Sequence, residues 1–214
     1  MSRFCMFHPV GQPMERGWVG RVEGKRVIQL AAQTLQSFFT GGGTAREHAE
    51  YGLKDVVLLA PVLHPPSVRL FDDARSFTFA NPAAIVGPGA TITPPSSTVS
   101  TGRLNAHSRI AAVIGADGAI GGFTGLVEWR ARGIPPPKDR DFALGLGPVV
   151  VTTAPVSSGF DWAATIAFAA AGTVLHPGDL VAGPALERTG GVEAGAVISI
   201  ELDGIGVLEQ RVAG

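Results

Sequence analysis

The chain has 214 residues, a net charge of −1 and a single cysteine, Cys5. The near-neutral charge gives no electrostatic reason to expect a nucleic-acid or anionic-membrane partner, and one cysteine cannot form an intrachain disulfide. Hydrophobic residues make up 45% of the chain and charged residues 16%, which is typical of a globular protein with a sizeable core. No apolar run approaches the ~20 residues that cross a bilayer, and the N-terminus lacks the pattern of a signal peptide. We therefore expect a soluble, cytoplasmic protein.

Residues 1–60 are predicted to form a small N-terminal α/β lobe. Gly17–Val22 and Lys25–Leu30 are expected to be short strands, and Gly24 between them suits a tight turn because glycine adopts positive φ at low cost. A helix is predicted over Ala31–Phe39, where it meets three consecutive glycines.

A second short helix is predicted from Thr44. Thr44 and Glu47 have the spacing of a capping box, and Gly52 would end the helix. Val56–Leu59 is predicted to be the strand that closes the lobe.

Residues 61–214 are predicted to form a mainly β domain, so that the whole chain is α+β with coiled mixed sheets and few short helices. Many turns are expected because the chain has 29 glycines and 16 prolines. One helix is predicted over Phe160–Ala171, with Ser157 or Ser158 as its N-cap and Gly172 as its stop. The strands are expected at Val68–Phe71, Arg109–Ile114, Phe123–Trp129, Val149–Val151, Ala196–Leu202 and Val207–Val212.

Most charge in the central region lies at strand ends or in a proline-rich loop. His107 and Arg109 are two residues apart on one predicted strand, so both side chains point to one face. Lys138 and Asp141 lie in the loop, where they could serve a site or form a solvated pair. Asp72 and Asp73 follow another strand and could supply a base or form a turn that faces water.

Five short motifs, in order, resemble the fumarylacetoacetate hydrolase family, and the resemblance runs from about residue 82 to the C-terminus. It implies the coiled β fold of that family. The matching residues are Ala112-Val113-Ile114-Gly115, Gly122-Phe123-Thr124 with Arg132, Lys138 and Asp141 with Gly147-Pro148, Leu175-His176-Pro177-Gly178-Asp179, and Gly204-Ile205-Gly206-Val207-Leu208.

The resemblance also implies a metal site that this chain has not kept. The family holds Mg²⁺ or Mn²⁺ with three carboxylates, and the matching positions here are His107, Arg109 and Glu128. Hard cations need several oxygen ligands, and an arginine cannot ligate a metal. We therefore expect no metal cofactor. Arg109 is inferred to pair with Glu128 in place of the cation, either as part of a binding site or as an ion pair with a structural role alone.

Two functions follow from the resemblance. In the first, the protein acts on or binds a 2-oxo or 1,3-dicarbonyl carboxylic acid, with the C–C hydrolase, decarboxylase, hydratase or tautomerase chemistry that the family performs through an enolate. The catalytic candidates are then Lys138 and Glu128, and the substrate-binding candidates are Arg109, His107, Arg132 and Asp141.

In the second, the protein is a catalytically inactive member that serves as a ligand-binding protein or as the partner subunit of an active paralogue. The loss of the metal pair favours this alternative, as does the absence of a histidine in the loop after Phe71, where the family carries one. A small carboxylate ligand and a homodimer are expected in either case, with no nucleic-acid and no membrane partner.

Overall fold

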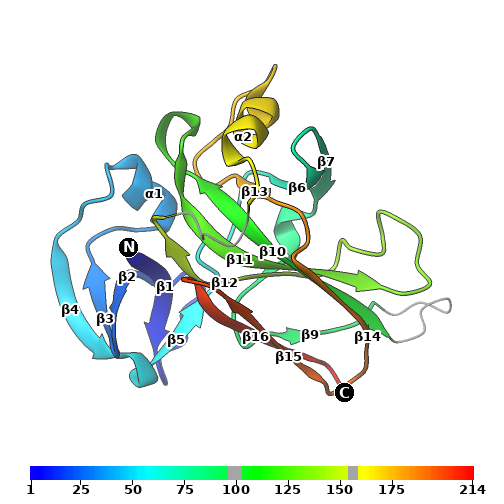
Figure 1. Cartoon of the computed structure of the whole chain (residues 1–214). Coiled ribbons are helices and arrows are strands. Elements are labelled where there is room, and N and C mark those ends of the chain that lie inside the picture. The colour runs from blue at the N-terminus through cyan, green and yellow to red at the C-terminus, as the bar shows by residue number, and fades with distance from the viewer. Residues whose placement is uncertain (96–102, 154–158) are drawn as a thin grey trace.

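The computed structural model describes residues 1–95, 103–153 and 159–214. Within these ranges, strands dominate and form one 13-stranded and one 3-stranded sheet (Figure 1). This confirms the predicted mainly β class with few short helices. In the N-terminal part, the elements are β1 (Arg3–Pro9), β2 (Trp18–Glu23), β3 (Arg26–Leu30), α1 (Leu35–Thr40), β4 (Glu47–Gly52), a single turn of 3-10 helix (Leu53–Asp55) and β5 (Val56–Leu59).

The remaining elements form the centre of the large sheet and the small sheet. None of the described helices is long and apolar enough to cross a membrane. The elements are β6 (Val68–Asp73), β7 (Ser76–Ala80), β8 (Ile85–Val86), β9 (Thr91–Ile92), β10 (Leu104–Ile114), β11 (Ile120–Ala131), β12 (Leu144–Val151), α2 (Trp162–Ala170), β13 (Leu180–Ala182), β14 (Glu187–Val192), β15 (Val197–Leu202) and β16 (Gly206–Val212), with 3-10 turns at Pro82–Ala84 and Ala116–Gly118.

The prediction of a helix that starts at Thr44 is wrong. Residues 47–52 form β4, which pairs antiparallel with β3 and places Ile28 opposite Glu50. Glu50 also forms an ion pair with Arg26 on β3. Strand pairing thus overrides a local capping pattern. Residues 47–52 form backbone hydrogen bonds with the edge of β3, whereas a helix this short is only marginally stable by itself.

The capping box that the structure does contain belongs to α1. Thr34 accepts from the backbone N–H of Ser37, and the Ser37 side chain accepts from the N–H of Thr34. This helix begins later than predicted because the N–H of Ala31 donates to the carbonyl of Arg46, which continues the β3–β4 pairing.

Helix α2 is confirmed, with a corrected start. Its N-cap is Asp161, whose carboxylate accepts from the N–H of Ala164 at 2.9 Å. The two serines predicted as N-caps lie outside the described residues. Gly172 has φ +73°, which suits the predicted stop just beyond the helix.

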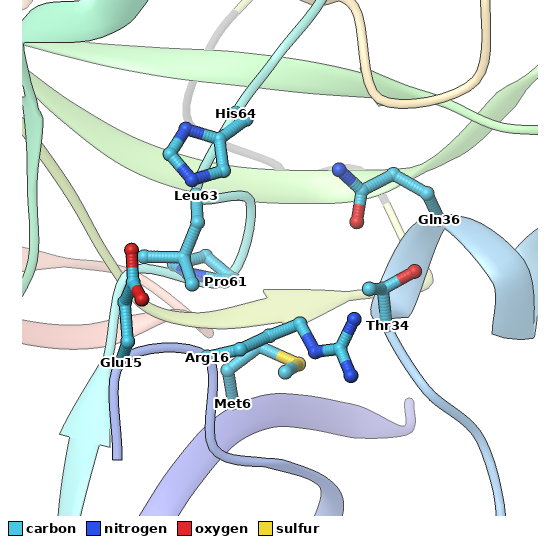
Figure 2. A pocket seen from close by; sticks show the side chains of 8 residues that line it. All are labelled: Met6, Glu15, Arg16, Thr34, Gln36, Pro61, Leu63 and His64. Carbon is cyan, nitrogen blue, oxygen red and sulfur yellow. The ribbon is translucent and has the colours of Figure 1, made fainter. Parts of the chain in front are cut away.

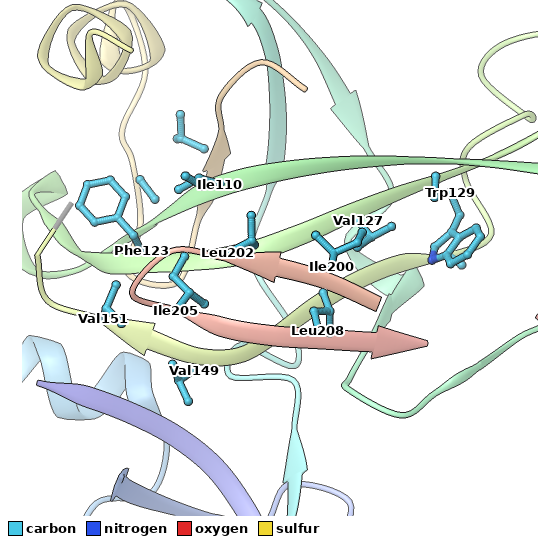
Figure 3. Close-up of a cluster of buried hydrophobic side chains, with 14 of the residues drawn as sticks. Ile110, Phe123, Val127, Trp129, Val149, Val151, Ile200, Leu202, Ile205 and Leu208 are labelled. Carbon is cyan, nitrogen blue, oxygen red and sulfur yellow. The ribbon is translucent and has the colours of Figure 1, made fainter. Parts of the chain in front are cut away.

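The large sheet is built around the β10–β11 hairpin. β11 pairs with β12, β12 with β1, and β10 with β13, which runs parallel to β6. One face of the hairpin packs against the small sheet through Val127 and Trp129, with Ile200 and Leu208 opposite them (Figure 3). Here the Trp129 indole donates to Gln210 at 2.7 Å, so that a buried hydrogen bond joins the two sheets.

The sheet runs across the predicted domain boundary at residue 60. β1 pairs with both β5, which precedes this boundary, and β12, which follows it. The division into residues 1–60 and 61–214 stays a prediction.

The motif that ends in Asp179 has a structural role. The buried Asp179 carboxylate accepts from the N–H of His176 and from the Ser67 hydroxyl, both at 2.7 Å, and lies 3.6 Å from the Arg69 guanidinium. Asp179 therefore fixes the turn into β13 and joins it to the start of β6.

Candidate functional site

The β10–β11 register brings three predicted residues together. His107 lies directly opposite Glu128, and Arg109 lies two residues further along β10. Because strand side chains alternate, all three share one face of the sheet. Glu128 has no exposed surface and Arg109 is 1% exposed, so this is a charged pair inside the core.

Every donor of Arg109 is occupied. Its Nε and Nη2 donate to Glu128 Oε2 at 3.1 and 2.9 Å, and Nη2 also donates to Asp72 at 3.1 Å. Its Nη1 donates to the carbonyls of Phe71 and Gly183, both at 2.9 Å. A guanidinium has five N–H donors, and these bonds use all of them.

The second oxygen of Glu128 also faces arginines. Arg130 Nε donates to Oε1 at 2.7 Å, and Arg140 Nη1 lies 3.6 Å from the same atom. Arg140 in turn donates to Asp139 at 2.9 Å. We call the six residues Asp72, Arg109, Glu128, Arg130, Asp139 and Arg140 the arginine–carboxylate network.

The network balances its own charge, since it joins three guanidinium groups to three carboxylates. A buried carboxylate without such partners would be costly, and a buried ion pair is tolerated when its remaining polar atoms are satisfied. The network meets both requirements without a metal ion.

Sequence reasoning missed Arg130 and Arg140. Arg130 had a readable signal, because it lies two residues after Glu128 on one strand and so faces the same side. Arg140 lies in the proline-rich loop, and the conformation of this loop brings it close to Glu128. A loop has no regular periodicity from which this position could be predicted. Asp72, a candidate base on the sequence alone, lies against Arg109 in the structure, with its side chain 65% exposed.

His107 borders the network without a hydrogen bond. Its Nδ1 is buried, has no hydrogen-bond partner in the described part of the chain, and lies 3.9 Å from Glu128 Oε2. Burial is the main cause that lowers the pKa of His107 below its ordinary value, and the nearby Arg130 lowers it further. Both effects favour the neutral form of the imidazole.

We expect His107 to reduce stability in mild acid. Its folded pKa is lowered, so the unfolded chain takes up the proton first as the pH falls through about 6.5, and the free energy of unfolding drops below that pH. The charged groups that face the ring are Glu128, Arg130, Arg109 and Arg188. Denaturant unfolding of the His107→Gln variant should show a weaker loss between neutral and mildly acidic pH than the unmodified protein. Equal pH dependence in both proteins would contradict this.

The other predicted residues lie at the surface. Lys138 Nζ is 2.6 Å from Asp141, and the Lys138 side chain is 74% exposed. Arg132 is exposed, and within the described residues its side chain forms no ion pair or hydrogen bond. The structure thus pairs Lys138 with Asp141, whereas Arg140 is the residue of this loop that approaches Glu128.

These residues do not fit a divalent cation. Of His107, Arg109 and Glu128, the three positions that the sequence resemblance matches to metal ligands, only Glu128 is a carboxylate. Both its oxygens face guanidinium groups. Across the described ranges, no group of three or more histidine, cysteine, aspartate or glutamate side chains is arranged to hold a metal.

Comparisons with known proteins identify the fold. No family model matches the sequence, and no curated protein does. Solved structures do match over nearly their whole length. A 2-hydroxyhepta-2,4-diene-1,7-dioate isomerase from Mycobacterium marinum is 22% identical with a TM-score of 0.80, covering 100% of this chain and 98% of its own.

Two further structures agree. A maleylpyruvate hydrolase from Sphingobium sp. SYK-6, in complex with manganese(II) and pyruvate, is 21% identical with a TM-score of 0.77 and covers 99% of this chain and 98% of its own. A 5-carboxymethyl-2-hydroxymuconate delta-isomerase from Mycobacterium smegmatis is 19% identical with a TM-score of 0.76 and covers 99% of this chain and 99% of its own. The chain therefore has a fumarylacetoacetate hydrolase-like fold.

Proposed function

We propose that this chain is a metal-free, catalytically silent protein with a fumarylacetoacetate hydrolase-like fold, in which Arg109 takes the place of the divalent cation. The observation that supports this most is the complete use of the Arg109 donors by Glu128, Asp72 and two backbone carbonyls. A guanidinium with no free donor is built to hold the scaffold together, because any ligand must first break a buried, charge-assisted bond.

The same contacts explain why a scaffold without metal can keep Glu128. In the related family the cation supplies the counter-charge of the carboxylates. Here Arg109 and Arg130 supply it from both sides of Glu128. The carboxylate then has neither a free oxygen for a metal nor the freedom to act as a base.

A silent protein of this fold would serve as a ligand-binding protein for a small carboxylate or as the partner subunit of an active paralogue. We also propose a homodimer, the assembly that the family resemblance implies. Sedimentation equilibrium at micromolar concentration should give twice the chain mass of 22.1 kDa. A species of the chain mass would contradict the dimer and leave the metal replacement standing.

The second candidate is a metal-free enzyme that acts on a 2-oxo or 1,3-dicarbonyl acid, with Lys138 and Glu128 as catalytic groups and Arg109, His107, Arg132 and Asp141 around the substrate. The Lys138–Asp141 pair favours it, since both motif residues are present and in contact. The exposure of Lys138 and the enclosure of Glu128 weigh against it, because acid–base groups must reach the substrate within hydrogen-bond distance.

An activity assay separates the two candidates. The unmodified protein is mixed with an acylpyruvate, with and without Mn²⁺, and loss of the enol absorbance is followed. The proposed function predicts no turnover above the buffer rate. Turnover that disappears in the Lys138→Met variant, with its thermal midpoint unchanged, would establish the enzyme instead.

A further inference from the structure

A cavity of about 530 Å³ lies between the N-terminal segment and the chain that leads into β6. It is remote from the arginine–carboxylate network along β6, because Leu63 and His64 precede that strand whereas Arg109 contacts Phe71 near its other end. The volume is in the range of small-molecule sites, which are concave, largely apolar and carry a few convergent polar groups.

Apolar side chains line part of the cavity. Met6 on β1 is 2% exposed, Pro61 is buried, and Leu63 is half-buried (Figure 2). This surface would pack against the carbon chain of a ligand and exclude water from its middle.

A free cation stands on one side of the cavity. The Arg16 guanidinium is directed toward Thr34, and the Gln36 side chain projects into the same space from α1 (Figure 2). Within the described residues the Arg16 side chain has no ion pair or hydrogen bond. Unlike Arg109, Arg16 therefore has all five donors open, and a guanidinium fork matches a carboxylate with two parallel bonds.

A free acid stands on the other side. The Glu15 side chain diverges from Arg16 and ends beside Leu63, below His64 (Figure 2). The described part of the chain provides no ion-pair partner for Glu15. An unpaired carboxylate and an unpaired guanidinium on two sides of one cavity are complementary to a ligand with an ammonium group at one end and a carboxylate at the other.

The backbone next to Glu15 and Arg16 packs closely against β1. Gly17, directly after Arg16, has φ +66°, and a Cβ atom there would collide with the carbonyl oxygen of Phe7 on β1. The segment that carries Glu15 and Arg16 is thus anchored against the sheet at a position that only glycine can occupy.

We propose that this cavity binds a small ω-amino acid, with its carboxylate on Arg16 and Gln36, its carbon chain over Met6, Pro61 and Leu63, and its ammonium group on Glu15. The site shares no residue with the arginine–carboxylate network. Its test therefore stands or falls separately from the metal replacement.

The probes are γ-aminobutyrate, δ-aminovalerate and ε-aminocaproate, titrated into the unmodified protein and followed by calorimetry. At least one should bind at millimolar concentration or below. Arg16→Met and Glu15→Gln should each weaken that binding about tenfold or more, because each removes a charged partner. Both residues are exposed, so the thermal midpoints of these variants should equal that of the unmodified protein.

Two matched controls define the outcome. Arg75→Met removes an exposed arginine outside the cavity and should leave the affinity unchanged. Valerate, which lacks the amine of δ-aminovalerate, should bind about tenfold or more weakly than its amino counterpart. The proposal is overturned if none of the three amino acids binds, if Arg16→Met keeps the full affinity, or if valerate binds as well as δ-aminovalerate.

Discussion

Replacing Arg109 by methionine should lower the free energy of unfolding by about 3–5 kcal/mol, the cost of removing one partner of a buried ion pair. Methionine preserves much of the side-chain length, so the loss comes from charge and hydrogen bonds rather than from an empty cavity. It leaves the Phe71 and Gly183 carbonyls without their donors and removes two bonds to Glu128. Urea unfolding measures the change directly.

The matched control is Arg75→Met, a surface arginine that should change stability by no more than about 0.5 kcal/mol. Adding Glu128→Gln to Arg109→Met should cost much less than the sum of the two single changes, because each single change by itself already breaks the Arg109–Glu128 pair. If Arg109→Met is as stable as the control variant, Arg109 does not neutralise a buried charge and the metal-replacement account fails.

Restoring acids at both lost positions should create a metal site. The double variant His107→Glu/Arg109→Glu places three carboxylates on the β10–β11 face, at the positions that the sequence resemblance matches to the metal ligands of the fumarylacetoacetate hydrolase family. Without metal it should be less stable than the unmodified protein, because like charges then crowd Glu128. With Mn²⁺ at about a hundred times its dissociation constant, it should gain ~2.7 kcal/mol of stability.

The matched control for the metal is His107→Gln/Arg109→Gln, which has similar shape and no added carboxylates. Thermal unfolding with and without Mn²⁺ should show a metal-dependent rise for the glutamate variant and none for the glutamine variant. If both variants remain folded and Mn²⁺ raises the thermal midpoint of neither, the two missing carboxylates are not the reason that this fold lacks a metal site.

The sequence predicted the scaffold better than the site. The strands at residues 109–114 and 123–129 were found because their apolar runs are long, and the structure only extends them into β10 and β11. The prediction of a helix from Thr44 was wrong because a local capping pattern contains no information about the open edge of β3, with which these residues pair. Such pairing depends on segments that are separated in the sequence, so local sequence patterns do not reveal it.

Within the site, the shared face of His107 and Arg109 followed from strand alternation alone, whereas the position of Glu128 opposite them rested on the family resemblance. The full coordination of Arg109 was beyond prediction, because it depends on carbonyls of Phe71 and Gly183 from two distant segments. Every residue has a backbone carbonyl, so residue identity does not show which carbonyls accept from Arg109. An arginine whose donors are all used inside the protein and one that binds a substrate therefore look alike in sequence.

The most direct test of the central claim is an anomalous-scattering map of crystals of the unmodified protein soaked in Mn²⁺. The account predicts the Arg109 guanidinium on Glu128, held by the Phe71 and Gly183 carbonyls, with no manganese peak at either carboxylate oxygen. A manganese ion at bonding distance from Glu128, with Arg109 turned away, would contradict it and make metal-dependent chemistry on a 2-oxo acid the leading function.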